Sequence, residues 1–175
     1  MKMIVIGSPG SGKTYLSQII CQRLDLPCLH LDVIWHDMDY SSQAEERFGQ
    51  LLFEFMQGHE RWLIDGNFQN SLAIRLAEAD HVVWLKRPRV FNLLRVLKRS
   101  LLFAFSSSSR PEMPKTFKES LDRDYLTFLA FVWQFSKSYP AMEKQLQSYD
   151  GKVSVLRSKK EMDAFLTSLT SLATD

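Results

Sequence analysis

Cysteine is scarce in this chain of 175 residues, which contains only Cys21 and Cys28. Two cysteines are too few for a disulfide framework, and no paired spacing of cysteine and histidine indicates a zinc site. We therefore interpret both as reduced thiols in the core of a cytoplasmic protein. The four histidines show no metal-ligand spacing either, so the sequence assigns them no role.

Long apolar runs and a strong excess of charge are also missing. No segment approaches the roughly 18 consecutive apolar residues of a membrane span, and the apolar stretch at the N-terminus breaks at Gly7, too early for a signal peptide. The net charge of +2 is too small to imply wholesale nucleic-acid binding, although it allows a local basic patch. The composition, 45% apolar and 24% charged, is that of one ordinary globular domain spanning residues 1–175.

Short apolar runs alternate with longer patterns of helical spacing. Five runs read as buried strands, and they cover residues 3–6, 28–31, 61–64, 81–85 and 152–156. Capping-box patterns at Ser42 with Glu45 and at Ser158 with Glu161 predict two helix starts, and Pro140 predicts a break in the last long helical pattern. The alternation predicts an α/β fold with three layers, in which helices flank both faces of a parallel five-stranded sheet.

The carboxyl ends of the predicted strands gather the polar residues of interest. Ligands of open parallel sheets bind beyond these ends. Gly7, Asp32, Asp65 and the residues after Leu85 all follow or end a predicted strand. We expect them to share one crevice.

The segment GSPGSGKT, between the first strand and the first helix, matches the pattern G-x-x-x-x-G-K-[ST]. This phosphate loop consists of Gly7, Ser8, Pro9, Gly10, Ser11, Gly12, Lys13 and Thr14. Its glycines let main-chain N–H groups converge on phosphate oxygens, and the helix N-terminus adds its dipole. Lys13 can reach the outer phosphates, and the Thr14 hydroxyl can ligate Mg²⁺. A plain turn would not require this lysine and hydroxyl, so the loop predicts a bound nucleoside triphosphate, with ATP and Mg²⁺ as the expected ligands.

Three further residues near the strand ends are candidates with open alternatives. Asp65 ends an apolar run, which is typical of the aspartate that holds the water ligands of Mg²⁺, but such an aspartate can also be a turn or cap. Asp32 could act as the base for an acceptor hydroxyl, as a second metal contact or as a cap. Trp35 could stack on a flat substrate or pack as an ordinary aromatic residue.

No acidic residue lies between Asp80 and Glu112. The window contains seven basic residues: Lys86, Arg87, Arg89, Arg95, Lys98, Arg99 and Arg110. Arg95 and Arg99 are four residues apart and share one helix face. Two guanidinium groups pointing the same way suit a phosphoryl group in transfer. A solvated basic face and a nucleic-acid patch remain as alternatives.

The chain resembles the nucleotide-kinase-like branch of phosphate-loop (P-loop) proteins and, within it, the DNA topology modulation proteins. The resemblance runs through nearly the whole chain: GSPGSGKT, HLD with the following tryptophan (30–35), WLIDGNF (62–68), ADHVVWLKRPR with LLRVLKR (79–99) and ESLDRDYLTFLAFVWQF (119–135). It implies a P-loop nucleotide-kinase fold with a short lid at about 104–116, and phosphate contacts from Arg95 and Arg99.

The resemblance also defines a departure. Arg110 and Arg123 would be further clamps beside the lid, but DGNFQ (65–69) lacks the arginine that adenylate kinases carry after Asp-Gly-Phe-Pro. Arg75 could compensate as a substrate contact, or it could be an ordinary surface arginine.

These observations together predict a kinase that transfers the γ-phosphoryl group of Mg-ATP to a small acceptor, such as a nucleoside, a nucleotide or a related metabolite. Lys13, Arg95 and Arg99 would stabilise charge, Thr14 and Asp65 would manage Mg²⁺, and Asp32 would serve a hydroxyl acceptor. The alternatives are a nucleotide-dependent regulator acting on DNA topology and a nucleotide-binding scaffold without chemistry. The sequence leaves open a monomer or a homodimer, because LLFAF (101–105) could be core, lid hinge or dimer contact.

Overall fold

Five parallel strands form one sheet in the order β2-β3-β1-β4-β5, seen in a computed structural model that describes residues 1–39, 41–105 and 123–172. The strands are β1 (Lys2–Gly7), β2 (Cys28–His30), β3 (Trp62–Asp65), β4 (His81–Leu85) and β5 (Lys152–Leu156). All five predicted strands are confirmed. Their bounds shift by no more than one residue at either end, because the apolar runs that predict them are the segments buried between two helical layers.

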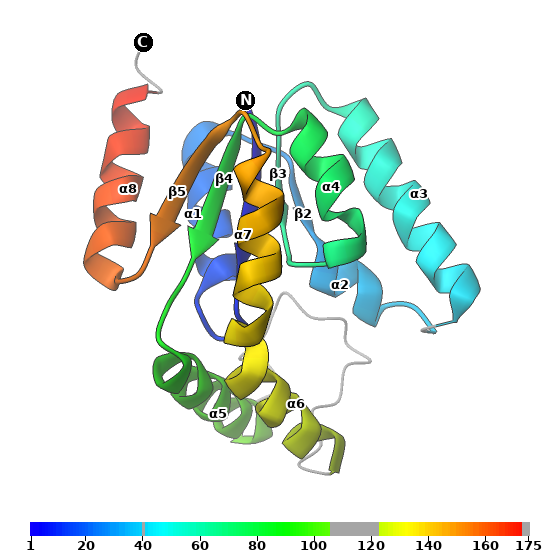
Figure 1. The fold of residues 1–175 in the computed structure, drawn as a ribbon, viewed down its shortest axis with the longest axis vertical. Coiled ribbons are helices and arrows are strands. Elements are labelled where there is room, and N and C mark those ends of the chain that lie inside the picture. Colours follow the sequence, from blue (N-terminus) through cyan, green and yellow to red (C-terminus); the bar gives the residue numbers. More distant parts are fainter. Residues whose placement is uncertain (40, 106–122, 173–175) are drawn as a thin grey trace.

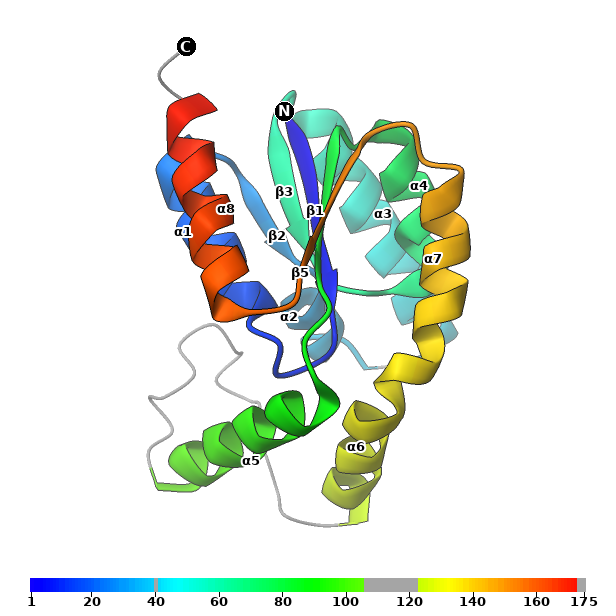
Figure 2. The same cartoon turned by 60° about the vertical axis from the view of Figure 1, so that its left-hand side comes forward.

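Helices cover both faces of the sheet (Figure 2), and α1 and α8 lie on one face while α3, α4 and α7 lie on the other. The helices are α1 (Lys13–Leu24), α2 (Leu31–His36), α3 (Ser42–Gly58), α4 (Gln69–Glu78), α5 (Arg89–Phe105), α6 (Arg123–Gln134), α7 (Tyr139–Gln147) and α8 (Lys159–Leu172). Successive side chains of β1 alternate between the two cores: Met3 and Val5 face α1 and α8, whereas Ile4 and Ile6 face the opposite layer. The predicted three-layer α/β architecture is confirmed.

The carboxyl ends of the strands point toward α2, α5 and α6 (Figure 1). The helix α5 continues through Phe105, so residues 101–105 are helical, and Leu101 and Leu102 are half exposed rather than core. The rest of the predicted lid, 106–116, and Arg110 lie outside the described residues. Arg123 begins α6.

The structure confirms some of the predicted helix boundaries and corrects one of them. The Ser158 hydroxyl accepts a hydrogen bond from the Glu161 main chain at 3.1 Å, which confirms that capping box. The other one is wrong by a residue: Ser41 caps α3 by accepting from Ala44 N, and Ser42 is already helical. The break at Pro140 is confirmed, because a short 3₁₀ segment (η2, Phe135–Ser138) separates α6 from α7, which begins around this proline.

Two expectations about environment can be compared with the structure. Cys21 and Cys28 are both free and half-buried, and both pack against the core on the α1 side. Within the described residues, every helix is too short or too polar to cross a lipid bilayer.

Candidate functional site

The phosphate loop connects β1 to α1 through backbone conformations that favour glycine. Gly10 and Gly12 have φ angles of +78° and +98°, which side chains with a Cβ rarely adopt. A Cβ on Gly10 would collide with the main-chain carbonyl oxygen of Asn92 in α5. The loop is therefore closely packed against α5, and Gly10 is needed for that approach.

The start of α1 presents polar groups to the space above the loop. The first α-helical main-chain bond runs from Leu16 N to Gly12 O, and the N–H groups before it have no partner within the helix. The Lys13 side chain is buried and its ammonium group donates to the Ser8 carbonyl oxygen at 3.4 Å. Thr14 lies in the same first turn and is half-buried. A helix start with free amides and a nearby cation forms an anion site.

A hydrogen-bonded pair lies beside the loop, at the ends of β2 and β3. His30 and Asp65 are partners in the parallel register, and His30 Nδ1 lies 3.0 Å from Asp65 Oδ2. The Asp65 side chain is buried. The hydrogen bond to Asp65 raises the pKa of His30 and outweighs the opposing effect of burial. The hydrogen bond fixes the orientation of the Asp65 carboxylate and occupies one of its two oxygen atoms, Oδ2.

Asn67 connects the end of β3 to the root of the phosphate loop. Its side-chain amide makes two hydrogen bonds with the main chain of Gly7: Gly7 N donates to Oδ1 at 2.9 Å, and Nδ2 donates to Gly7 O at 2.8 Å. Because Gly7 is the first residue of the loop, these two hydrogen bonds connect the start of the loop to the segment that follows Asp65.

Arg75 does not face the crevice, which corrects the prediction of a substrate contact and also the alternative of a surface arginine. Its side chain is fully buried. The guanidinium group donates to four main-chain carbonyl oxygens, those of Gly66, Asn67, Phe68 and Ser71, at 2.8–3.3 Å. Burial lowers its pKa to about 10, and the charge of Asp65 opposes this shift. Arg75 thus shapes the segment after β3.

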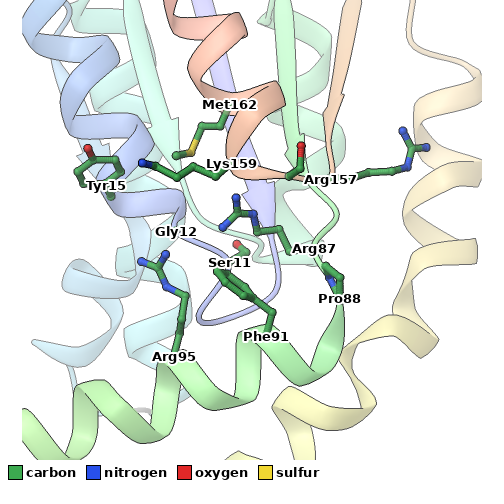
Figure 3. A pocket seen from close by; sticks show the side chains of 11 residues that line it. Ser11, Gly12, Tyr15, Arg87, Pro88, Phe91, Arg95, Arg157, Lys159 and Met162 are labelled. Atoms are coloured by element: carbon green, nitrogen blue, oxygen red, sulfur yellow. The ribbon is translucent and has the colours of Figure 1, made fainter.

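A cavity of about 480 Å³ opens beside the phosphate loop, between α1, the start of α5 and the start of α8 (Figure 3). It is lined by Ser11, Gly12, Tyr15, Arg87, Pro88, Phe91, Arg95, Arg157, Ser158, Lys159 and Met162. Arg95 reaches from α5 toward the loop, and its guanidinium lies within 4.0 Å of the position that a Cβ on Gly12 would take. Arg99, one turn further along α5, is half-buried and does not line this cavity.

The candidates on α2 differ from what the sequence predicts. Asp32 does not end β2, because the helix α2 already begins at Leu31, and its side chain is exposed in the first turn. Trp35 makes edge contacts with Phe48 and Phe68, at ring-centre distances of 5.9 and 6.0 Å. Packing in an aromatic cluster therefore accounts for Trp35, and stacking on a substrate stays a prediction.

The predicted Mg²⁺ role of Thr14 and Asp65 fits the geometry. Among the described residues, no group of three or more histidine, cysteine or acidic side chains could hold a metal ion. A Mg²⁺ ion that arrives with a nucleotide needs no such group, because phosphates and water supply most of its ligands. Asp65 Oδ1 is buried and has no hydrogen-bond partner within the described residues. A metal-bound water would satisfy this oxygen.

Three residues of this region have no role in the sequence-based prediction: His30, Asn67 and Arg87. His30 and Asn67 act through hydrogen bonds that depend on strand pairing, so only the predicted strand ends could have indicated them. Arg87 lies two residues past the end of β4, in the window without acidic residues, and that position is a signal in the sequence. The structure places Arg95 beside Gly12 of the loop, and Asn67 connects Gly7 of the loop to the segment that follows Asp65.

An all-parallel five-stranded sheet flanked by helices, with this loop after β1, defines a P-loop kinase fold. No protein-family model and no curated protein matches the chain by sequence. The likeness therefore rests on solved structures.

Three kinases superpose on nearly the whole chain. A shikimate kinase from Bacteroides thetaiotaomicron has a TM-score of 0.58 at 14% identity, covering 100% of this chain and 99% of its own. A shikimate kinase from Acinetobacter baumannii, in complex with shikimate, has a TM-score of 0.58 at 13% identity, with coverages of 99% and 92%. A deoxyadenosine kinase from M. mycoides with bound dATP has a TM-score of 0.58 at 13% identity, with coverages of 97% and 99%. These three structural neighbours are small-molecule kinases.

Proposed function

We propose that the protein is a kinase that transfers the γ-phosphoryl group of a Mg²⁺-bound nucleoside triphosphate, ATP on the sequence-based prediction, to a small acceptor. The observation that carries this proposal is the position of Arg95. Its guanidinium lies beside Gly12 of the phosphate loop, at the mouth of a nucleoside-sized cavity of about 480 Å³. An anion site, a cation above it and an adjoining cavity are the parts that triphosphate binding requires.

The chemistry of transfer divides among the chain's own residues. The acceptor oxygen bonds to the γ-phosphorus, the bond to the β,γ-bridging oxygen breaks, and the nucleoside diphosphate leaves. The amides at the start of α1 and the Lys13 ammonium bind the phosphate oxygens, and Arg95 offsets charge that develops during transfer. Mg²⁺, when bound, would neutralise phosphate charge next to Thr14 and Asp65. Arg99 remains a second candidate for charge stabilisation.

The acceptor is proposed to carry a hydroxyl group. An acceptor that is itself a phosphate needs cationic clamps, and the burial of Arg75 removes the arginine expected to supply one. A hydroxyl acceptor instead needs a group that takes its proton, and Asp32 is an exposed carboxylate in α2, just past the end of β2. The structural neighbours named for shikimate and deoxyadenosine support a small hydroxyl-bearing acceptor.

The alternative of a nucleotide-dependent regulator of DNA topology, suggested by the narrower family resemblance, has less support. Its basis in the sequence is the basic helix 89–105. In the structure Arg95 of this helix lies beside Gly12 of the phosphate loop, a position that supports contact with a nucleotide rather than with a duplex. Tight duplex binding that weakens steeply with salt would favour the regulator.

The test is a screen of nucleosides, sugars, polyols and nucleoside monophosphates for acceptor-dependent release of nucleoside diphosphate. Lys13→Ala should abolish turnover with any acceptor while the circular dichroism spectrum stays native. Asp32→Asn should reduce the rate about 100-fold or more with a hydroxyl acceptor and leave triphosphate binding unchanged. Turnover retained by Lys13→Ala, or triphosphate binding without turnover on any acceptor, would contradict the kinase.

A further inference from the structure

Arg87 is a buried cation that the proposed chemistry does not use. It lies two residues past the end of β4, and only 6% of the residue is exposed, yet it lines the cavity beside the phosphate loop. Figure 3 shows its guanidinium between Ser11 of the loop and Met162 of α8, pointing into the cavity. No nitrogen of Arg87 is among the fully buried atoms that lack a hydrogen-bond partner, so its guanidinium group is open to the cavity, where an acceptor on a ligand can serve as its partner.

The described residues do not supply that partner. The Arg87 guanidinium has neither an ion pair nor a hydrogen-bond acceptor among them, and it lies over the ring of Phe91, 4.6 Å from the ring centre. Burial lowers the pKa of Arg87, and the nearby charge of Arg95 adds to that effect. The charges of two acids of α8, Asp163 and Glu161, oppose this shift. Asp163 pairs with Lys159 at 4.0 Å, and Glu161 bonds to Ser158 and to the main chain of Arg157.

The other groups that line the cavity limit the kinds of ligand that can bind in it. No carboxylate lines it, and its charged side chains are all cations, which donate hydrogen bonds but accept none. The Ser158 hydroxyl is already engaged with Glu161 in both directions. The cavity wall therefore offers mainly donors to a base that lies in it.

Purines differ in what they present to such a wall. Guanine presents two acceptors on one edge, N7 and O6, and an arginine fork matches this pair with two parallel hydrogen bonds. Adenine presents N7 next to a 6-amino group, which is a donor and finds no acceptor on a guanidinium. A fixed, unpartnered arginine in the base cavity thus discriminates between the two.

We propose that Arg87 is a specificity-determining residue that reads the N7 and O6 atoms of a 6-oxopurine, so that the preferred phosphoryl donor is a guanine nucleoside triphosphate. The proposal rests on the proposed function, because it requires the triphosphate to bind at the phosphate loop with its base in this cavity. It replaces ATP, the donor expected from the sequence, with GTP.

The experiment is titration calorimetry of the full chain with four magnesium-bound nucleotides: GTP, ITP, ATP and 7-deaza-GTP. GTP and ITP share N7 and O6 and should bind alike, whereas ATP should bind about tenfold more weakly or worse. The analogue 7-deaza-GTP lacks one acceptor and should fall between them. ATP binding as tightly as GTP would overturn the proposal. Failure of all four to bind would instead overturn the proposed function.

Two variants connect the preference to Arg87. Arg87→Met keeps an unbranched apolar stem but has no donors, and it should bring the affinities for GTP and ATP to within about twofold of each other. Arg87→Lys keeps the charge without the fork and should retain binding with a reduced preference. Arg157→Met is the matched control, because Arg157 borders the same cavity but extends away from it (Figure 3). An unchanged preference in Arg87→Met would refute the assignment.

Discussion

His30 and Asp65 meet at the carboxyl end of the sheet, where His30 Nδ1 lies 3.0 Å from Asp65 Oδ2 and the other carboxylate oxygen is left without a hydrogen-bond partner among the described residues. The pair belongs to neighbouring strands in direct register. The pair orients a buried carboxylate next to the phosphate loop, so we expect it to affect both the stability of the protein and its binding of nucleotide.

His30→Gln should lower the free energy of unfolding in a pH-dependent way. The bond to Asp65 raises the pKa of His30 in the folded protein above its ordinary value of 6.5. The extra stability of the charged pair is therefore fully present below about pH 6.5 and is lost as the pH rises through the raised pKa. Chemical denaturation in metal-free buffer should show a difference between wild type and variant of about 1–3 kcal/mol at low pH, shrinking toward alkaline pH.

The double-mutant cycle with Asp65→Asn tests the assignment of this effect. If the two residues act as a pair, His30→Gln should cost little further stability in the Asp65→Asn background. A difference that stays flat with pH, or that survives in Asp65→Asn, would contradict the ion pair.

Asn67→Leu should loosen the root of the phosphate loop. The substitution removes both hydrogen bonds to the main chain of Gly7 and leaves two buried backbone groups without partners. We expect the free energy of unfolding to fall by about 1–3 kcal/mol, and nucleotide affinity to fall with it. Asn70→Leu changes an exposed asparagine of α4 and should alter stability by less than about 0.5 kcal/mol. Equal effects of both variants would contradict the role of Asn67.

The sheet could be predicted from the sequence because each of its strands is a continuous apolar run, and burial on both faces leaves few other uses for such a run. The phosphate loop could be predicted for a related reason: its chemistry is local, so eight consecutive residues carry it. Asp65 shares this property, since the end of its apolar run already marks the edge of the sheet.

The remaining features depend on contacts between distant segments. The role of His30 depends on which residue of β3 lies opposite it, and the sequence of β2 alone does not determine that register. An arginine in an amphipathic helix usually faces solvent, so the sequence gives no sign that Arg75 is buried. Its burial depends on the main-chain carbonyl groups that follow β3, which accept its hydrogen bonds. Asp32 was expected at a strand end because Leu31 extends an apolar run, but Leu31 is instead the first residue of α2.

Arg75→Lys should act on stability rather than on substrate binding. A lysine ammonium can reach one point, whereas the guanidinium serves four carbonyl oxygens at once. We expect a loss of about 2 kcal/mol or more in the free energy of unfolding, because several buried carbonyl groups lose their donor. Arg47→Lys, at an exposed position of α3, is the control and should be nearly neutral. A raised KM for the acceptor at unchanged stability would restore the substrate contact predicted from the sequence.

Gly10→Ala should damage the phosphate loop through sterics alone. The new Cβ would overlap the carbonyl oxygen of Asn92 and would approach Val96 Cγ2 to 3.0 Å, at a φ of +78° that alanine rarely adopts. Relief of this overlap must move the loop away from α5 and therefore away from Arg95. Calorimetry should show triphosphate affinity reduced about tenfold or more, equivalent to about 1.4 kcal/mol.

Gly49→Ala is the matched control, because nothing lies within 4 Å of a Cβ at this position in α3. It should raise the free energy of unfolding by about 0.5–1 kcal/mol and leave affinity unchanged. Wild-type affinity in Gly10→Ala would mean that the close packing between loop and helix is not needed to bind the phosphates.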